Sequence, residues 1–163
     1  MPNADFKFTH NEQTQKLKDG CYTRKVSKAL NNLRSRQLKD VPIENVMITC
    51  AKVAWYANGD KATNKPGPFA KNSNLRGANW LANITRGTND FAHCSHLIYL
   101  QNKYPNPALT SWLGVGNKHY SDAHALTELI QWVWRLRIRR GEPITLYFAS
   151  KRMRQLFEAW LQS

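Results

Sequence analysis

The sequence predicts an α/β domain, a single lobe in which helices flank a mainly parallel sheet. Short apolar runs of strand-favouring residues alternate with segments of helical periodicity, which is typical of this fold class. The chain has 163 residues, the size of one ordinary domain, and 42% of them are apolar. With six each of Trp, Tyr and Phe, this composition is sufficient to bury one core.

The N-terminal part of the chain divides at a turn. Residues 1–20 are polar and end in Asp19-Gly20, so we expect a flexible or peripheral arm there, followed by a single α/β domain over residues 21–163. The arm is either mobile or a short peripheral helix. Between Tyr22 and Leu38, apolar residues recur at helical spacing and basic residues fill other positions: Arg24, Lys25, Lys28, Arg34 and Arg36. This pattern predicts a basic N-terminal helical segment.

Three apolar runs are predicted as strands, and the first two of them as buried strands. Residues 46–56 follow a Pro-containing turn, and residues 97–100 and 144–148 are short runs bounded by turn-forming residues. Gly and Pro residues recur over 57–77, which predicts a long surface loop between the first two strands.

Two further helices follow from the apolar spacing. Ser121 is a suitable N-cap with Asp122 in the first turn, and Gly141 and Pro143 end the segment. Its predicted apolar face consists of Ala125, Leu126, Leu129, Ile130, Val133 and Leu136. The final predicted helix has its apolar face at Met153, Leu156, Phe157, Trp160 and Leu161.

The charge balance points to a polyanionic partner. The chain has 24 Lys and Arg against 11 Asp and Glu, a formal net charge of +13. Such a surface attracts phosphates and releases their counterions, so we expect binding to nucleic acid, with single strands fitting best. Arg24 and Lys28 of the basic helix are candidate contacts. A purely solubilising role is the alternative, and a membrane surface ranks lower because no helix joins a lysine-lined face to an exposed apolar stripe.

The cysteines and the N-terminus indicate a cytoplasmic protein. Cys21, Cys50 and Cys94 are widely spaced and form no CxxC pair, which favours free thiols in a reducing compartment. We find no leader pattern and no membrane-spanning run, so we expect the cytosol, that of a host cell if the chain is phage-encoded.

No metal site is predicted. His93, Cys94 and His96 crowd together, and His119, His124 or Cys50 are possible further zinc ligands. A structural zinc site normally shows two recognisable ligand pairs, whereas this is one irregular cluster. Packed cysteines and hydrogen-bonded histidines are the simpler interpretation.

Two segments are candidates for phosphate contact. Thr127, Gln131, Arg135 and Arg139 are spaced by four, which places them on one ridge of the predicted helix. Guanidinium forks and an amide suit phosphate groups, while pairing of the arginines with Glu128 or Glu142 on a solvated face is the alternative. The second candidate is a glycine among small polar residues, where backbone can approach a phosphate or form an ordinary turn: Arg86, Gly87, Thr88 and Asn89.

Four segments carry a family resemblance that covers the chain from about residue 78 onward. They are residues 85–91, the run 97–100 with Tyr104-Pro105-Asn106-Pro107 behind it, residues 129–135, and residues 143–154. Together they resemble the C-terminal, second RecA-like lobe of phage-encoded superfamily 2 helicases of the DEAD/DEAH type. The resemblance implies nucleic-acid and nucleotide contact by Gly87, Thr88 and Asn89, and an arginine-finger role for the helix with Gln131, Arg135 and Arg139. Trp134 stands where the family has glycine, and the arginine spacing is longer by one.

The sequence lacks the parts of an autonomous ATPase. It has no glycine-rich loop ending in Gly-Lys-Ser or Gly-Lys-Thr and no adjacent Asp-Glu pair. We therefore expect no catalytic residues and no cofactor in the isolated chain, and ATP and magnesium only where a partner lobe completes the site.

Three functions follow from these patterns. The first is a nucleic-acid-binding protein built on a helicase-like second lobe without autonomous ATPase. The second is an interaction protein, an inhibitor or accessory subunit, that docks on a helicase, nuclease or host defence complex. The third is an enzyme subunit that supplies an arginine finger to a separate ATPase lobe.

Overall fold

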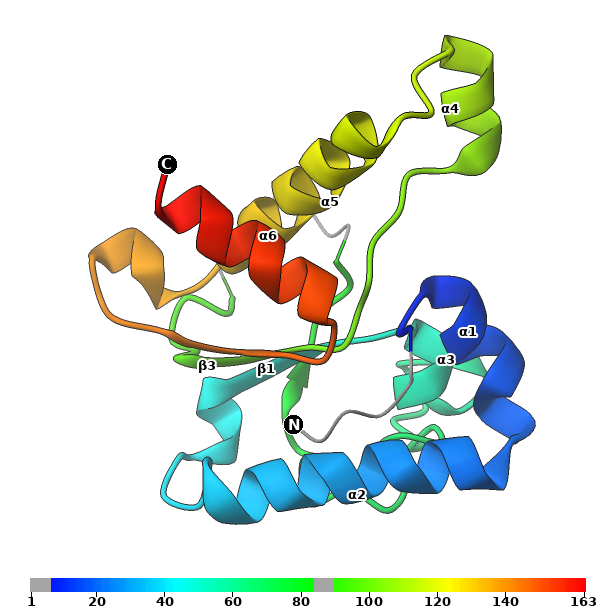
Figure 1. Cartoon of the computed structure of the whole chain (residues 1–163). Helices are drawn as coiled ribbons and strands as arrows, with labels where there is room; N and C mark the ends of the chain where they lie inside the picture. The colour runs from blue at the N-terminus through cyan, green and yellow to red at the C-terminus, as the bar shows by residue number, and fades with distance from the viewer. Residues whose placement is uncertain (1–6, 84–89) are drawn as a thin grey trace.

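The computed structural model describes residues 7–83 and 90–163, and these form one α/β lobe around a four-stranded sheet. The strands are β1 (Val46–Thr49), β2 (Asn79–Trp80), β3 (His96–Tyr99) and β4 (Thr145–Phe148). All three strand pairings are parallel, in the order β2-β1-β3-β4 (Figure 1). The predicted fold class is thus confirmed.

Helices cover both faces of this sheet. The long helix α2 (Gly20–Arg36) lies along one face, and α5 (Lys118–Val133) and α6 (Lys151–Leu161) lie on the other (Figure 1). The short helices α1 (His10–Gln15) and α3 (Lys52–Trp55) flank the sheet beside α2. Helix α4 (Pro107–Leu113) projects from the body of the lobe.

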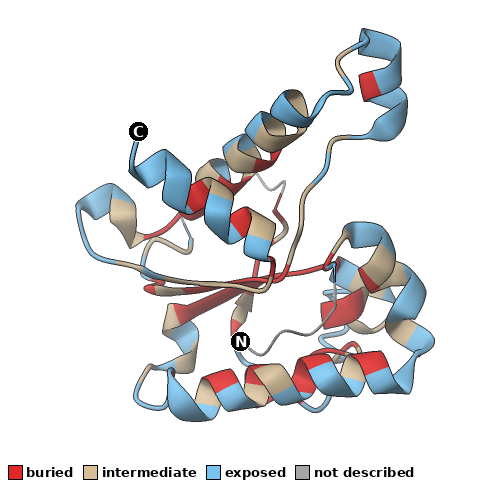
Figure 2. Cartoon of the chain, viewed as in Figure 1, coloured by how far each residue is buried: buried red, intermediate tan, exposed pale blue. Residues whose placement is uncertain are grey.

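The core has two parts because side chains alternate across the central strands. Val46 and Ile48 of β1 pack with the buried face of α2, whereas Met47 packs with α5 and α6. In β3, Ile98 joins the α2 side and Tyr99 joins the α5 side. Figure 2 shows buried residues along both central strands and on the side of α2 that faces them.

The predicted strand over 46–56 is wrong in its second half. The strand ends at Thr49, and Lys52–Trp55 forms α3. The prediction failed because a short apolar run does not by itself distinguish a strand from a buried helical turn. A loop then packs on α3: the Gly67 amide donates to Trp55 O at 2.7 Å. A Cβ at Gly67 would lie 2.7 Å from Ala54 O, so only glycine fits there.

The predicted loop over 57–77 is confirmed as irregular chain, apart from a short turn of 3-10 helix over Ala57–Gly59. It is not wholly a surface segment, since Phe69 and Leu75 belong to the core on the α2 side. The two-residue strand β2 and the helix α4 were not predicted, because neither carries a distinct apolar period.

Helix α5 begins earlier and ends earlier in the chain than the sequence pattern predicted. Asn117, not Ser121, caps it, since the Asn117 Oδ1 accepts from the Tyr120 amide at 2.8 Å. The helix ends at Val133, and a separate 3-10 turn spans Arg137–Arg140. Leu136 remains in the core although it lies outside the helix. The apolar spacing in the sequence therefore continues past the residue at which the helix ends.

The described part of the N-terminal arm packs against the lobe. The short helix that was one alternative for residues 1–20 is α1, and Phe8 before it is in the core. Gln13 is fully buried: its Nε2 donates to Phe8 O and Leu100 O, and its Oε1 accepts from the Ala51 amide at 2.8 Å. One side chain thus ties α1 to the segments that follow β1 and β3.

In the described residues, no helix has both the length and the apolar character that crossing a membrane requires.

The three cysteines are free, and we predict that they differ sharply in reactivity. Cys21 is exposed at the start of α2, whereas burial raises the pKa of the Cys50 thiol and raises that of Cys94 to about 11. Because the thiolate is the reactive form, Ellman's reagent should label Cys21 rapidly and the other two only after unfolding. Cys21→Ser should remove the fast phase, and a fast phase that survived it would contradict this assignment.

Candidate functional site

The strand order creates a crevice at one edge of the sheet. The chain leaves β1 toward β2 on one side and returns to β3 on the other, so the direction of winding changes between these two central strands. In open parallel α/β sheets, ligands bind outside the carboxyl ends of the strands at such a point. In this lobe, α1 and the segment after β3 lie at that edge (Figure 1).

A cleft of about 690 Å³ opens there, and we call it the carboxyl-edge cleft. Its walls come from the start of α1, residues 101–107, and the half-buried His124 and Glu128 of α5. The groups in it that carry chemistry are His10, Asn102, Lys103, Tyr104, His124 and Glu128. This volume lies within the range of small-molecule sites, roughly 300–1,000 Å³.

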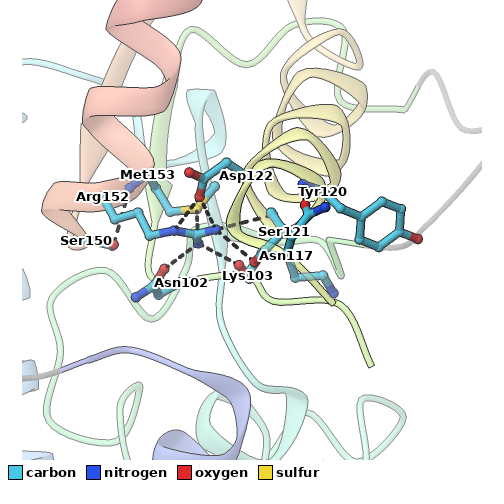
Figure 3. A network of polar contacts seen from close by, with 9 residues as sticks. All are labelled: Asn102, Lys103, Asn117, Tyr120, Ser121, Asp122, Ser150, Arg152 and Met153. Carbon is cyan, nitrogen blue, oxygen red and sulfur yellow. Dashed lines mark hydrogen bonds and ion pairs between the residues drawn. The ribbon is translucent and has the colours of Figure 1, made fainter. Parts of the chain in front are cut away.

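Arg152 organises the wall of the cleft from the first turn of α6. Its guanidinium donates to Asp122 Oδ1 at 2.7 Å, to Asn102 Oδ1 at 3.0 Å and to Lys103 O at 2.7 Å (Figure 3). It also lies 4.3 Å from the centroid of the Tyr104 ring. One side chain therefore joins three segments: the residues after β3, the first turns of α5, and α6.

A second polar group surrounds Glu128 on α5. Asn83 Nδ2 donates to Glu128 Oε2 at 3.3 Å, and Lys103 Nζ lies 4.0 Å from the same oxygen. Burial raises the pKa of the Tyr99 phenol, and the nearby Glu128 carboxylate raises it further. Asn83 is 4% exposed and Tyr99 is fully buried, yet Asn83 Oδ1 and Tyr99 Oη have no hydrogen-bond partner among the residues described. Buried polar atoms of this kind normally bond to protein, water or ligand.

A smaller hollow of about 290 Å³ adjoins the cleft. Tyr104, Pro105 and Pro107 line both. Tyr120 lines the smaller hollow and stacks on His124 of the larger one, with ring centroids 6.4 Å apart. Tyr104 is half exposed, which leaves an aromatic surface at the junction.

The predicted contacts on α2 lie together on its solvent side. Arg24 and Lys28 are exposed, and the same spacing of four continues through Asn32 to Arg36, which are exposed as well. We call these four residues the α2 ridge. Helix α2 carries five basic residues and no acidic one.

The predicted ridge on α5 is wrong as a geometric unit. Gln131 is exposed in the helix, but Arg135 follows its end and Arg139 lies in the separate 3-10 turn. Arg135 is only 7% exposed and donates its Nε to Gln131 O at 3.1 Å, whereas Arg139 is exposed. Their contact with phosphate stays a prediction. Arg86, Gly87, Thr88 and Asn89 lie outside the described residues.

Among residues 7–83 and 90–163, no three possible metal ligands group together, and the histidines and cysteines of the cluster have other neighbours. His93 Nε2 lies 3.0 Å from Glu44 O. His96 stacks on Tyr147, and burial lowers its pKa. Cys94 is fully buried.

Sequence reasoning missed most of the cleft. Its lining comes from the start of α1, the segment after β3, α4 and α5, and Asn83 and Arg152 contact that lining from elsewhere in the chain. No local pattern links these residues. A usable signal was present: Asn102 and Lys103 closely follow β3, and Arg152 closely follows β4. In a parallel sheet, polar residues after adjacent strands meet at one edge.

Comparison with known proteins extends this description. A family model described as "YonV C-terminal Rossmann-like domain" matches residues 2–161. The chain is 39% identical over 85 residues to the "SPbeta prophage-derived uncharacterized protein YonV" of Bacillus subtilis (strain 168). That match covers 52% of this chain and 21% of the relative, so the chain spans about a fifth of the length of the protein it resembles. No solved structure matches the chain.

Proposed function

This chain belongs to the family of YonV C-terminal Rossmann-like domains, and from that premise we propose that it binds single-stranded nucleic acid through the α2 ridge. The observation that carries the proposal is the distribution of charge on α2, which has five basic residues and no acidic one. The net charge of +13 gives the rest of the lobe the same sign.

The ridge has the geometry of a phosphate-binding edge. Residues four apart advance about 6 Å along a helix and turn only about 40° away from one another. Arg24 and Lys28 are thus neighbours on the solvent side of α2, and Arg36 is also exposed although the drift adds up to about 120° between Arg24 and Arg36. The exposed Lys71 belongs to the segment that hydrogen-bonds to Asn31 of the helix. Contacts of this type release counterions from the nucleic acid and make its binding depend on salt.

The resemblance to a helicase second lobe supports the same proposal. A prophage-derived relative is in keeping with a phage-encoded lobe that acts on nucleic acid in the host cytosol. In this proposal Gly87, Thr88, Asn89, Gln131, Arg135 and Arg139 are additional contacts to the nucleic acid, which must extend beyond the α2 ridge to meet Gln131, because α5 lies on the other face of the sheet. ATP and magnesium enter only where a partner lobe supplies the phosphate-binding loop that the sequence lacks.

The test is a triple variant, Arg24→Ala with Lys28→Ala and Arg36→Ala. Binding of a fluorescent oligo-dT is measured over a series of salt concentrations. Loss of three phosphate contacts should lower the affinity about 10- to 100-fold and reduce the slope of log K against log salt by about 2. Because all three side chains are exposed, the melting temperature should change little.

A matched triple variant removes the same charge elsewhere. Lys118, Arg140 and Lys151 are exposed at the starts of α5 and α6 and in the 3-10 turn. Replacing them with Ala should weaken binding far less. Equal losses in the two triples would exclude the α2 ridge as the interface, and no binding by the unmodified chain in dilute buffer would exclude the function. Nuclease-resistant, salt-insensitive binding to a protein would instead support the interaction-protein alternative.

A further inference from the structure

We propose that the carboxyl-edge cleft binds one nucleoside unit, with its base stacked on Tyr104 and its hydrogen-bonding edge toward Glu128. The site is separate from the α2 ridge. The occupant is either a base of the bound strand, in which case the inference rests on the proposed function, or a free nucleoside.

The aromatic platform is the first part of the argument. Tyr104 is 50% exposed, although aromatic rings of its size are normally largely covered. The Arg152 guanidinium covers one face of the ring at 4.3 Å from its centroid, so the remaining surface lines the cleft and the adjoining hollow. Stacking of a base on an exposed aromatic ring contributes about 1–3 kcal/mol and tolerates every base.

The platform is held in place before any ligand arrives. Arg152 bonds to the carbonyl of Lys103, the residue before the tyrosine, and to the side chain of Asn102. Pro105 follows the tyrosine and fixes its own φ, which further limits the backbone. Binding therefore orders little additional chain, which lowers the entropic cost of association.

Glu128 supplies a hydrogen-bond acceptor to the cleft, where Lys103 and several side-chain amides supply donors. Asn83 does not itself line the cleft, but it holds the Glu128 carboxylate through Nδ2, and its own buried Oδ1 has no partner among the described residues. Exocyclic amino groups of bases donate to such acceptors, as the N4 amine of cytosine does to Glu. The cleft should therefore prefer bases with an exocyclic amine over thymine and uracil.

Size and charge agree with this occupant. A cleft of about 690 Å³ with an adjoining hollow of about 290 Å³ holds a base and its sugar. Lys103, His10 and His124 lie around the cleft, where they can contact the hydroxyls or a phosphate of the ligand. Since Lys103 lies 4.0 Å from Glu128, the cleft does not concentrate positive charge as the α2 ridge does.

The test uses 2-aminopurine, a fluorescent base with an exocyclic amine, in two forms: inside an oligo-dT and as the free riboside. Saturable quenching by the unmodified chain is expected in at least one form. Tyr104→Leu should weaken the quenching affinity at least fivefold, whereas Tyr104→Phe should retain it because stacking needs only the ring. Glu128→Gln should reduce the preference for cytidine over thymidine as competitors.

Trp112→Ala is the matched control. Trp112 is an aromatic residue that is 81% exposed, and it lines neither hollow. Quenching that falls equally in Trp112→Ala and Tyr104→Leu, or that never saturates in either probe form, would overturn the proposal.

The two sources of the base and the two proposals are distinguishable in the same assay. The α2 triple variant should weaken binding of the oligonucleotide but leave the riboside affinity unchanged. Saturable riboside binding without oligonucleotide binding would retain the cleft and exclude the proposed function. Oligo-dT binding without quenching in either probe would retain the function and exclude the cleft.

Discussion

Replacing Gln13 with Ala is expected to lower the free energy of unfolding by about 4 kcal/mol, the largest effect that we predict for a single polar side chain. Gln13 is fully buried and makes hydrogen bonds to three backbone groups, those of Phe8, Ala51 and Leu100. Phe8 O keeps the Asn102 amide as a donor, so the Ala51 amide and Leu100 O are the groups that lose this partner. Each buried group left without a partner costs about 1–3 kcal/mol, and the truncated side chain leaves a void beside them.

The loss of stability in Gln13→Ala should be concentrated at the carboxyl edge of the sheet. Without Gln13, α1 retains few links to the segments after β1 and β3, of which the Asn102 amide to Phe8 O at 2.8 Å is one. Amides of α1 should then exchange with solvent faster than those of β1 and β3.

Chemical denaturation of Gln13→Ala beside Gln15→Ala measures this effect. Gln15 lies in the same helix but is exposed, so its replacement should change stability by less than about 0.5 kcal/mol. If the two variants were equally stable, Gln13 would not hold α1 in place. A drop of about 4 kcal/mol should also lower the melting temperature by roughly 10 °C in a domain of this size.

Arg152→Met should destabilise the lobe by about 3 kcal/mol and disturb the cleft at the same time. Methionine preserves most of the volume but leaves Asp122 without the cation that lies 2.7 Å away, and it leaves Lys103 O without its donor. Arg152→Lys should recover only part of the loss, because an ammonium group does not reproduce a planar fork that reaches several acceptors.

Arg154→Met is the control for this prediction. Arg154 is two residues further along α6, and its 3.6 Å contact with Glu158 joins two exposed side chains, so the pair contributes little. Denaturation midpoints of the two variants should differ clearly. In addition, Arg152→Met should weaken 2-aminopurine quenching, since Tyr104 loses the side chain that covers one face of its ring. Equal midpoints would show that the network does not stabilise the fold.

The sequence was sufficient for elements whose signal is local. The apolar period of α2 and of α6 and the apolar runs of β3 and β4 match the structure, because each buries one continuous face or strand. The run after β1 was misassigned because Ala54 and Trp55 are buried in a helical turn, where burial hides the period. The end of α5 was misplaced because Leu136 stays in the core beyond the helix.

The candidate cleft was beyond local reasoning for a different physical reason. Gln13 belongs to a polar segment that the sequence predicts to be exposed to solvent, and its hydrogen-bond partner Leu100 lies 87 residues away. Arg152 likewise has the position of a surface residue on an amphipathic helix, yet its guanidinium donates a hydrogen bond to Asn102, 50 residues earlier in the chain. Such contacts are set by the sheet order. The exposed α2 ridge, by contrast, follows directly from the charges on one predictable helix.

The parallel pairing of the two central strands has a consequence for synthesis of the chain. Thr49 at the end of β1 pairs with Tyr99 at the end of β3, and no tight hairpin can join such strands. At about 5–20 residues per second, a ribosome needs roughly 3 to 10 s to make the intervening chain. During that interval the apolar run Val46–Thr49 lacks the strand that pairs with it in the folded lobe, so transient contacts or chaperones must cover it until β3 is made.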